Sequence, residues 1–260
     1  ADINNDGFLD VLLTGNSSTP DNSFLYKNNG DNTFTLLNVG IPGLHNGTAV
    51  WGDYNNDGFI DLLIAGSIFE NGNPAVVKTL LFENNGDETF TEIRPGIDDL
   101  TFADAAWGDY DKDGDLDLFI IGAQNPSSPF NPVSKLFRND ITVSNNPPTA
   151  PENLISQVSY NTVNLSWDKS TDTETDQNGL TYNVVISTTD LGLNILSPLS
   201  NLNNGYRKVV RFGNSFSLNN ILLENLAAGT YYWSVQSIDN GFLSSGFAAS
   251  GSFTVKDTIK

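Results

Sequence analysis

A nine-residue segment rich in aspartate occurs three times in the first half of the chain, and it constrains the fold more than any other feature. The three copies begin at Asp2, Asp53 and Asp109, spaced 51 and 56 residues apart. An apolar run that ends in glycine follows each copy, and an Asn-Asp or Asn-Asn-Gly-Asp segment recurs further along the chain. Self-similarity at a period of about 50 residues is typical of repeat architectures such as β-propellers.

The residues between the copies predict short antiparallel strands. Around the second copy an apolar strand ends at Trp-Gly-Asp, and further strands are expected at 62–66, 79–83 and 89–93, with an Asn-Gly turn before the last. Asn-Gly between apolar runs is a strong hairpin signal because both residues tolerate positive φ. Four such strands make one propeller blade. The first copy lacks a strand before its loop, and the third offers only 141–143 as a fourth strand, so we expect further propeller blades of the same parent chain.

Each segment has the oxygen ligands and the glycine that a tight calcium loop needs. Positions 1, 3, 5 and 9 carry side-chain oxygens, and position 6 is a glycine that permits a sharp bend. Ca²⁺ takes six to eight oxygen ligands at about 2.3–2.6 Å and tolerates irregular geometry. The expected ligands are these side chains and the position-7 backbone carbonyl: Asp2, Asn4, Asp6, Asp10 and the carbonyl of Phe8 in loop 1; Asp53, Asn55, Asp57, Asp61 and the carbonyl of Phe59 in loop 2; Asp109, Asp111, Asp113, Asp117 and the carbonyl of Asp115 in loop 3.

Other readings of these loops fit the residues less well. An EF-hand needs a bidentate Glu at position 12 and flanking helices, but position 12 is Leu13, Ile64 or Ile120. Mg²⁺ prefers few carboxylates and several waters. Transition metals usually need His or Cys, whereas His45 lies outside every loop and Cys is absent. Solvated turns without an ion would leave crowded carboxylates repelling one another. We therefore expect about three bound Ca²⁺ ions.

These residues also carry a family resemblance. The three loops, the Trp-Gly-Asp before two of them and the Phe-x-Asn-Asn-Gly-Asp-x-Thr-Phe segment at 82–90 resemble FG-GAP/VCBS-type repeats. The resemblance covers about residues 1–143. It implies calcium-stabilised blades like those of integrin α-subunits and of many bacterial surface proteins, and hence a secreted or cell-surface protein of bacterial origin.

The charge of the 260-residue chain argues against several kinds of partner. It carries 31 acidic and 12 basic side chains, a formal net charge of −19, and the first 146 residues hold 22 of the acids. Nucleic acid is disfavoured because its phosphates need Lys and Arg, and so is an anionic membrane surface. The sequence contains no run of 18 apolar residues, so no membrane-spanning segment is predicted.

From residue 148 the pattern becomes that of a β-sandwich. The proline-rich stretch 144–150 predicts a stiff linker. In the domain that follows, 151–260, apolar and polar residues alternate at 163–167, 180–187 and 231–238, as in half-buried strands. About 110 residues with some seven short strands are typical of a sandwich.

The second domain resembles a fibronectin type III domain. Pro-x-Ala-Pro-x-x-Leu opens it at 148–154, and Leu-x-x-Gly-Thr-x-Tyr from Leu226 to Tyr232 resembles the tyrosine-corner segment. The resemblance implies a spacer or interaction module with Trp167, Tyr182 and Tyr232 in its core. Its loop 172–179 has alternating acids but no closing carboxylate, so a solvated turn is favoured over a fourth cation site.

No catalytic residues are expected. His45 has no nucleophile elbow nearby, and no phosphate-binding or dinucleotide fingerprint occurs. Paired carboxylates can hydrolyse glycosides, but the clustered aspartates are already assigned to ions.

The sequence therefore predicts an all-β chain, a partial β-propeller of three blade-like repeats followed by a fibronectin type III-like β-sandwich. The favoured function is a calcium-binding extracellular adhesion or ligand-display module of a larger protein, with an extracellular protein or glycan as its ligand. A non-catalytic accessory region of a larger secreted, polysaccharide-degrading enzyme is the main alternative. A structural stalk that binds nothing is a weaker one.

Overall fold

The computed structural model describes residues 1–15, 23–68, 76–190 and 192–257. Within these ranges the chain is all-β, with sixteen strands and no helix, which confirms the predicted fold class at that level. The contacts divide it into two compact units, Ala1–Ser144 and Asn145–Lys260. Nothing in the described ranges forms a helix of the length and hydropathy needed to span a membrane.

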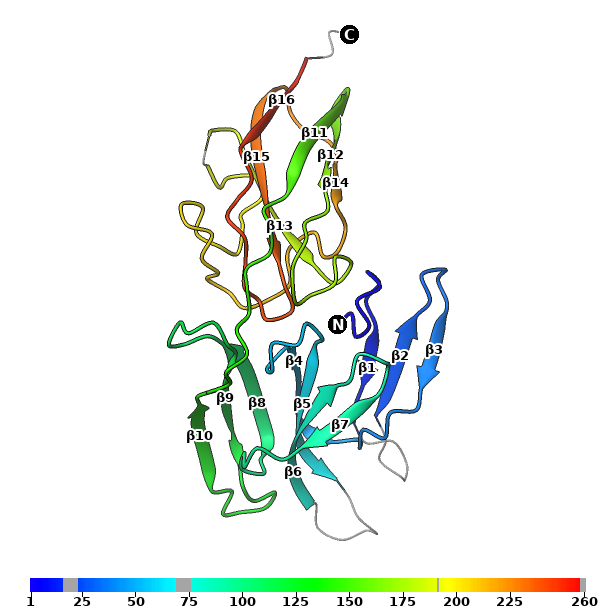
Figure 1. Cartoon of the computed structure of the whole chain (residues 1–260), viewed down its shortest axis with the longest axis vertical. Coiled ribbons are helices and arrows are strands. Elements are labelled where there is room, and N and C mark those ends of the chain that lie inside the picture. The colour runs from blue at the N-terminus through cyan, green and yellow to red at the C-terminus, as the bar shows by residue number, and fades with distance from the viewer. Residues whose placement is uncertain (16–22, 69–75, 191, 258–260) are drawn as a thin grey trace. The chain divides into compact units, whose positions relative to one another are not determined.

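The first unit contains three antiparallel sheets, one for each acidic loop (Figure 1). Strands adjacent in sequence pair within each sheet, so every sheet is a meander. The sheets are β1 (Val11–Leu13), β2 (Phe24–Asn28) and β3 (Phe34–Leu37); β4 (His45–Gly52), β5 (Asp61–Ile68), β6 (Val76–Asn84) and β7 (Phe90–Ile93); and β8 (Thr101–Gly108), β9 (Asp117–Ala123) and β10 (Pro132–Phe137).

The middle sheet packs on both faces, and the alternation of side chains along β5 explains why. Leu62 and Ile64 lie in a cluster with Leu44, toward the first repeat. Leu63 and Ala65 point to the opposite face, where they join a cluster with residues of β8 and β9. Because both faces are covered, nearly all of β5 is buried, and an unbroken apolar run is the sequence that such a strand requires.

One strand expected at the end of the third repeat is absent. Residues 141–143 form no strand, so the third sheet ends at β10. The segment bonds elsewhere: the backbone carbonyl of Val143 accepts a hydrogen bond of 3.0 Å from the side-chain amide of Asn56 in loop 2. The strands expected at 62–66 and 79–83 are confirmed as parts of β5 and β6, and β7 covers most of 89–93.

The second unit consists of two three-stranded antiparallel sheets that share one apolar core. The strand orders are β11-β12-β14 and β13-β15-β16. The core lies between them and includes Trp167, Tyr182 and Trp233. The bounds are β11 (Glu152–Ser159), β12 (Thr162–Asp168), β13 (Thr181–Ser187), β14 (Asn220–Leu223), β15 (Gly229–Ile238) and β16 (Gly251–Val255).

Two expectations for this unit need correction. Six strands rather than about seven lie among its described residues, and the segment between β13 and β14 makes isolated bridges such as Ser200 with Arg207. Tyr232, expected in the core, is half-buried, whereas Tyr231 is buried and stacks on Phe253. The hydroxyl of Tyr231 donates to the backbone carbonyl of Ala227 at 2.9 Å. Side chains alternate along a strand, so only one of two consecutive tyrosines can face the core.

Candidate metal centre

Each acidic loop lies immediately before or between paired strands, and all three copies share a positive φ at two positions. Loop 2 joins β4 to β5, loop 3 joins β8 to β9, and loop 1 leads into β1. Position 4 has a positive φ in every copy, 55° at Asn5, 58° at Asn56 and 67° at Lys112, and so does the position-6 glycine. Glycine adopts positive φ without the steric cost of a Cβ atom, so it suits this bend.

The aspartate at position 9 is held by two backbone amides in every loop. One carboxylate oxygen accepts the position-2 N–H, at 2.9 Å for Asp10, 3.0 Å for Asp61 and 2.9 Å for Asp117. The other oxygen accepts the N–H of an asparagine at or after the end of the second strand that follows the loop (β2, β6 or β10), at 2.8, 2.8 and 2.9 Å respectively. These bonds fix the carboxylate that the sequence predicts will close the ion site.

The aspartate at position 1 is fixed in a similar way by the turn that follows it. Asp2 accepts the N–H of Gly7 at 2.8 Å, and Asp53 accepts that of Gly58 at the same distance. In loop 3 the corresponding Asp109 accepts from Lys112 at 2.6 Å. The turn thereby wraps around the first carboxylate in each copy.

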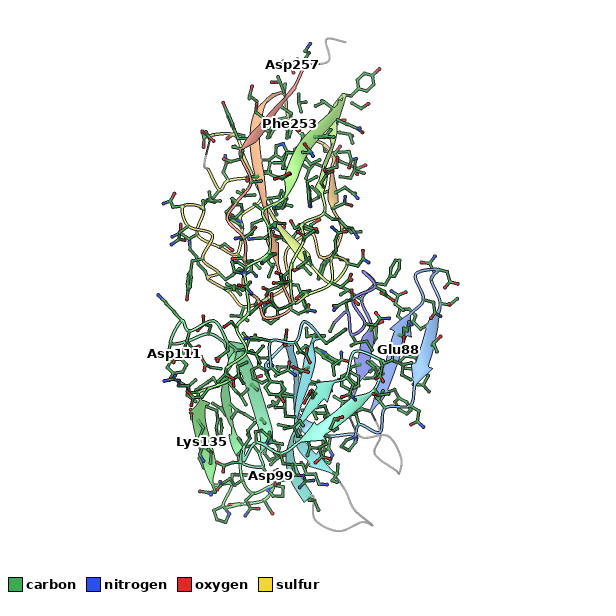
Figure 2. All side chains as sticks on the ribbon, viewed as in Figure 1. Glu88, Asp99, Asp111, Lys135, Phe253 and Asp257 are labelled. Atoms are coloured by element: carbon green, nitrogen blue, oxygen red, sulfur yellow. The ribbon has the colours of Figure 1, made fainter. Side chains whose placement is uncertain are left out.

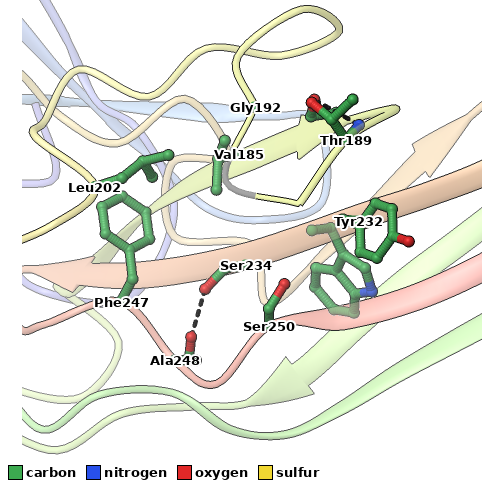
Figure 3. Close-up of a pocket in the computed structure, with 11 residues that line it drawn as sticks. Val185, Thr189, Gly192, Leu202, Tyr232, Ser234, Phe247, Ala248 and Ser250 are labelled. Carbon is green, nitrogen blue, oxygen red and sulfur yellow. Dashed lines mark hydrogen bonds between the residues drawn. The ribbon is translucent and has the colours of Figure 1, made fainter.

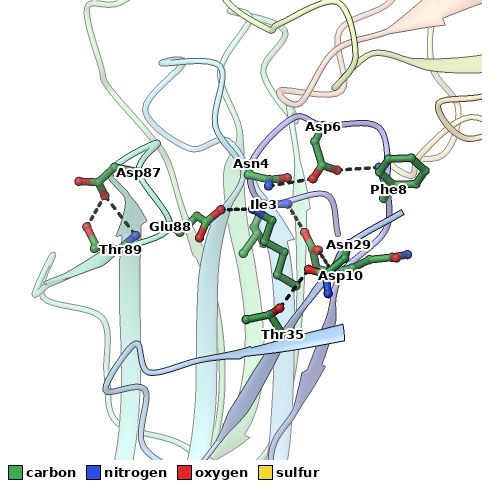
Figure 4. Close-up of polar contacts among 12 residues, drawn as sticks. Ile3, Asn4, Asp6, Phe8, Asp10, Asn29, Thr35, Asp87, Glu88 and Thr89 are labelled. Carbon is green, nitrogen blue, oxygen red and sulfur yellow. Dashed lines mark hydrogen bonds and ion pairs between the residues drawn. The ribbon is translucent and has the colours of Figure 1, made fainter. Parts of the chain in front are cut away.

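Positions 3 and 5 lie together in loops 1 and 2. The side-chain amide of Asn4 donates to Asp6 at 2.9 Å, and Asn55 does the same to Asp57 (Figure 4 shows the first pair). The side-chain oxygen of Asn4 is buried and has no hydrogen-bond partner among the described residues. A buried amide oxygen without a donor is costly, and a cation at this position would supply its missing partner.

Burial makes the loop carboxylates hard to ionise without a cation. Asp53 is 1% exposed and Asp61 is 0% exposed. Desolvation raises the pKa of Asp53 to about 7 and that of Asp61 to about 8. It also raises the pKa of Asp2 to about 6. Backbone N–H donors oppose these shifts, but the burial effect is larger. A divalent cation among these groups would favour the charged carboxylates.

Loop 3 shows the convergence of carboxylates most directly. One oxygen each from Asp109, Asp111 and Asp117 lies within 4.8 Å of the others. Arg138 approaches the same loop (Figure 2 labels Asp111), with ion pairs of 3.1 Å to Asp111 and 3.6 Å to Asp113. These exposed pairs contribute little stability, and the guanidinium partly balances the extra carboxylate of this loop.

Position 7 distinguishes the third loop from the other two. Its Asp115 has a buried side chain. This burial, and next the negative charge of nearby Asp113, raise the pKa of Asp115 to about 7. In the other loops position 7 is phenylalanine, which covers the glycine of the Asn-Asn-Gly-Asp turn. A Cβ atom at Gly30 would lie 2.6 Å from the ring of Phe8, and one at Gly86 would lie 2.7 Å from the ring of Phe59.

The donor set of the loops fits calcium. Carboxylate, amide and carbonyl oxygens are the ligands that Ca²⁺ prefers, and the predicted residues of each loop lie within one nine-residue turn. Such an ion would neutralise the crowded carboxylates. Calcium binding, and the individual atoms that would coordinate the ion, stay predictions.

Three asparagines from the recurring Asn-Asn-Gly-Asp and Asn-Asp segments belong to this framework. Asn28, Asn84 and Asn139 supply the second N–H to the position-9 aspartates. Their side-chain amides also reach the position-8 carbonyls of the same loops, at 3.2, 3.2 and 3.3 Å. Their recurrence at a similar distance after each position-9 aspartate was the available signal.

Two other places in the second unit, the loop 172–179 and a pocket, show no converging group of metal-binding side chains among the described residues. In loop 172–179, Asp172 accepts the N–H of Thr175 at 2.9 Å, and no group of three carboxylates or histidines converges in the described residues outside loop 3. A pocket of about 220 Å³ in the second unit lies beside Tyr232 and Phe247 (Figure 3). The described residues that line this pocket present hydroxyl and apolar groups, and none of them is an Asp, Glu, His or Lys.

Comparison with known families supports the repeat part of the prediction. The profile of the FG-GAP-like repeat matches residues 2–64 and, overlapping them, residues 53–120. Each matched segment begins at position 1 of an acidic loop and extends beyond position 9 of the next, so the two together contain all three loops. No curated protein matches the chain. The resemblance of the second unit to a fibronectin type III domain stays a prediction.

Proposed function

We propose that the first unit consists of calcium-stabilised propeller blades and that the chain is a non-catalytic adhesion or ligand-display module of a larger secreted or surface protein. The observation that carries this proposal is the hydrogen-bond framework repeated around buried carboxylates in all three loops. FG-GAP-like repeats are typical of extracellular proteins, and millimolar calcium is available there to occupy weak sites. Further blades of the parent chain would complete the ring.

The role of each ion in this proposal is structural. A bound Ca²⁺ supplies the positive charge that lets the carboxylates at positions 1, 5 and 9 ionise together. The chain's own residues shape the site: backbone amides orient the carboxylates, and the glycine at position 6 closes the turn. Because the site forms only in the folded hairpin, the binding free energy adds to the free energy of unfolding.

The second unit is proposed as a fibronectin type III-like spacer or interaction module. Its strand orders, β11-β12-β14 facing β13-β15-β16, correspond to the A-B-E and C-F-G strands of an immunoglobulin-like sandwich. Such a module positions the blades and offers loops for an extracellular protein or glycan. Neither unit is assigned a reaction.

Thermal unfolding of the whole chain tests the calcium proposal. At 10 mM Ca²⁺, a site with a Kd of about 10⁻⁴–10⁻³ M stabilises the folded state by about 1.4–2.7 kcal/mol. We expect Ca²⁺ to raise the Tm relative to EDTA, and Mg²⁺ at the same concentration to raise it much less. Equal Tm values in EDTA and in Ca²⁺ would overturn the proposal.

Ligand display is tested separately with immobilised extracellular-matrix proteins and polysaccharides. Retention of the chain that is lost in EDTA and restored by Ca²⁺ is the expected result. A chain that binds calcium but retains none of these ligands would reduce the role to that of a structural stalk.

A further inference from the structure

Two asparagines each make hydrogen bonds to two different acidic loops. The backbone N–H of Asn84 donates to Asp61 of loop 2, and its side-chain amide donates to the backbone carbonyl of Ile3 in loop 1 at 2.7 Å. Asn139 repeats this arrangement one blade later. Its N–H donates to Asp117 of loop 3, and its side-chain amide donates to the carbonyl of Tyr54 in loop 2 at 2.7 Å.

The acceptor in the neighbouring loop is the residue that holds the closing aspartate there. The N–H of Ile3 donates to Asp10, and the N–H of Tyr54 donates to Asp61. Asn84 therefore contacts the closing aspartate of loop 2 directly and that of loop 1 through the residue Ile3. The same path runs from Asn139 to the closing aspartates of loops 3 and 2.

A second bond links loops 1 and 2 at another position. The side-chain amide of Asn5, at position 4 of loop 1, donates to the carbonyl of Gly58, at position 6 of loop 2, at 2.9 Å. Both the donor and the acceptor are buried. This direct bond and the bridge through Asn84 thus join the same pair of loops, and a displacement of one loop is expected to act on the other.

From this geometry we infer that the loops bind calcium cooperatively, with Asn84 and Asn139 as positioning residues that transmit the effect between neighbouring loops. The inference rests on the calcium-binding role proposed above. When an ion fixes Asp61, the residue Asn84 is fixed with it, and its side chain then holds Ile3 and Asp10 in the arrangement that loop 1 needs. Binding in loop 1 favours binding in loop 2 by the same factor, because such coupling is reciprocal.

Asn28 offers a matched control. It has the same place in the first repeat, and its N–H and side-chain amide bond to Asp10 and to the carbonyl of Leu9 in its own loop. No bond from Asn28 to another acidic loop occurs among the described residues. Asn28→Ala therefore removes the bond within a loop and leaves the bonds between loops in place.

The test is a calcium titration of the whole chain, followed by NMR at the amides of the position-6 glycines Gly7, Gly58 and Gly114. These amides report each loop separately. Asp57→Ala, which weakens loop 2, is combined with Asn84→Ala and, separately, with Asn28→Ala. We expect Asp57→Ala to lower the calcium affinity of loop 1, read at Gly7, by about fivefold or more. The same loss is expected in the Asn28→Ala background, and a smaller loss, of about twofold, in the Asn84→Ala background, where the bond from Asn5 to Gly58 still joins the loops.

Two results would overturn the inference: an unchanged affinity at Gly7 when Asp57→Ala weakens loop 2, or an equal loss of affinity with and without the Asn84 side chain. If Asn84→Ala does not fold, Asn139→Ala replaces it, because Asn139 makes the same bridge between loops 3 and 2. Asp113→Ala then weakens loop 3, the loss of affinity is read at Gly58 in loop 2, and the same two results would overturn the inference. Failure of the proposed function would look different, since no position-6 glycine would then respond to calcium in the unsubstituted protein.

Discussion

The side-chain amide of Asn84 donates a hydrogen bond of 2.7 Å to the backbone carbonyl of Ile3, 81 residues earlier in the chain. This bond joins the end of β6 to the acidic loop of the preceding repeat. Together with the apolar contacts on both faces of β5, it shows that the repeats are connected at their loops as well as through their cores. The stability of one loop should therefore depend on its neighbours.

Asp57→Asn should reduce calcium-dependent stability while leaving the metal-free protein nearly unchanged. Asp57 is exposed, and one of its oxygens accepts the N–H of Phe59 at 2.9 Å, a bond that an asparagine oxygen can keep. Only the exposed bond from the Asn55 side-chain amide to the other oxygen is lost. The substitution removes one charge from loop 2. We expect the gain in the free energy of unfolding on adding 10 mM Ca²⁺ to fall by about 1–3 kcal/mol, as measured by urea unfolding.

Asp87→Asn is the control for that experiment. Asp87 accepts the N–H of Thr89 in a turn outside the acidic loops, and it too is exposed. Its substitution removes one negative charge with the same local bond retained. An equal loss of calcium response in both variants would mean that net charge, rather than the loop site, controls the response.

The metal-free protein should become less stable as the pH rises. Burial raises the pKa values of Asp2, Asp53 and Asp61 to about 6, 7 and 8, against 3.8 for an ordinary Asp. The folded state therefore binds these protons more tightly than the unfolded state. Their contribution is present in full below about pH 4 and is lost as the pH rises to about 8.

Calcium should reverse this trend, because it requires the ionised carboxylates. The difference in Tm between Ca²⁺ and EDTA is thus expected to be larger at pH 8 than at pH 5. A difference that is largest at pH 5, or a Tm in EDTA that does not vary between pH 5 and 8, would contradict this account of the buried aspartates.

Gly86→Ala should destabilise the second repeat through two effects that a second variant can separate. Gly86 has φ of 75°, and a Cβ atom there would lie 2.7 Å from the ring of Phe59. Gly96 has φ of 80° with open space around it. We expect Gly96→Ala to cost about 1 kcal/mol from backbone strain alone, and Gly86→Ala to cost more in urea unfolding with calcium present. Equal losses would mean that the Phe59 contact adds nothing.

The sequence predicted the loops well because their determinants are local. Spacing of Asp, Asn and Gly within nine residues sets both the turn and the candidate ligands, and the short apolar runs within 62–66 and 79–83 predicted β5 and β6. The bonds between loops depend on tertiary contacts instead. Asn84 follows a strand as an ordinary turn residue would, and only the packing of one repeat on the next brings it to Ile3.

The errors have the same origin. Residues 141–143 have a strand-like composition, but their backbone bonds to loop 2 rather than to β10. In the second unit the sequence motif pointed to Tyr232, while the structure places Tyr231 in the core. Which of two consecutive tyrosines faces inward is decided by the register of β15 with its neighbours.

Tyr231→Phe tests that register directly. It removes a hydroxyl that donates to the carbonyl of Ala227, and we expect a loss of about 0.5–1.5 kcal/mol in the free energy of unfolding. Tyr232→Phe should change stability by no more than about 0.5 kcal/mol, because no hydrogen bond of its hydroxyl occurs among the described residues. The reverse order of the two losses, measured by calorimetry, would favour the tyrosine-corner position of Tyr232.

The central claim is that each acidic loop holds one calcium ion, and the most direct measurement is the amount of Ca²⁺ bound per chain at equilibrium. Dialysis against millimolar Ca²⁺, followed by atomic emission, should give about three ions per chain, the number of acidic loops in the sequence. Asp57→Asn should lose the loop 2 ion. Binding of no calcium by the folded chain, or binding that is unaltered by substitution in the loops, would contradict the account.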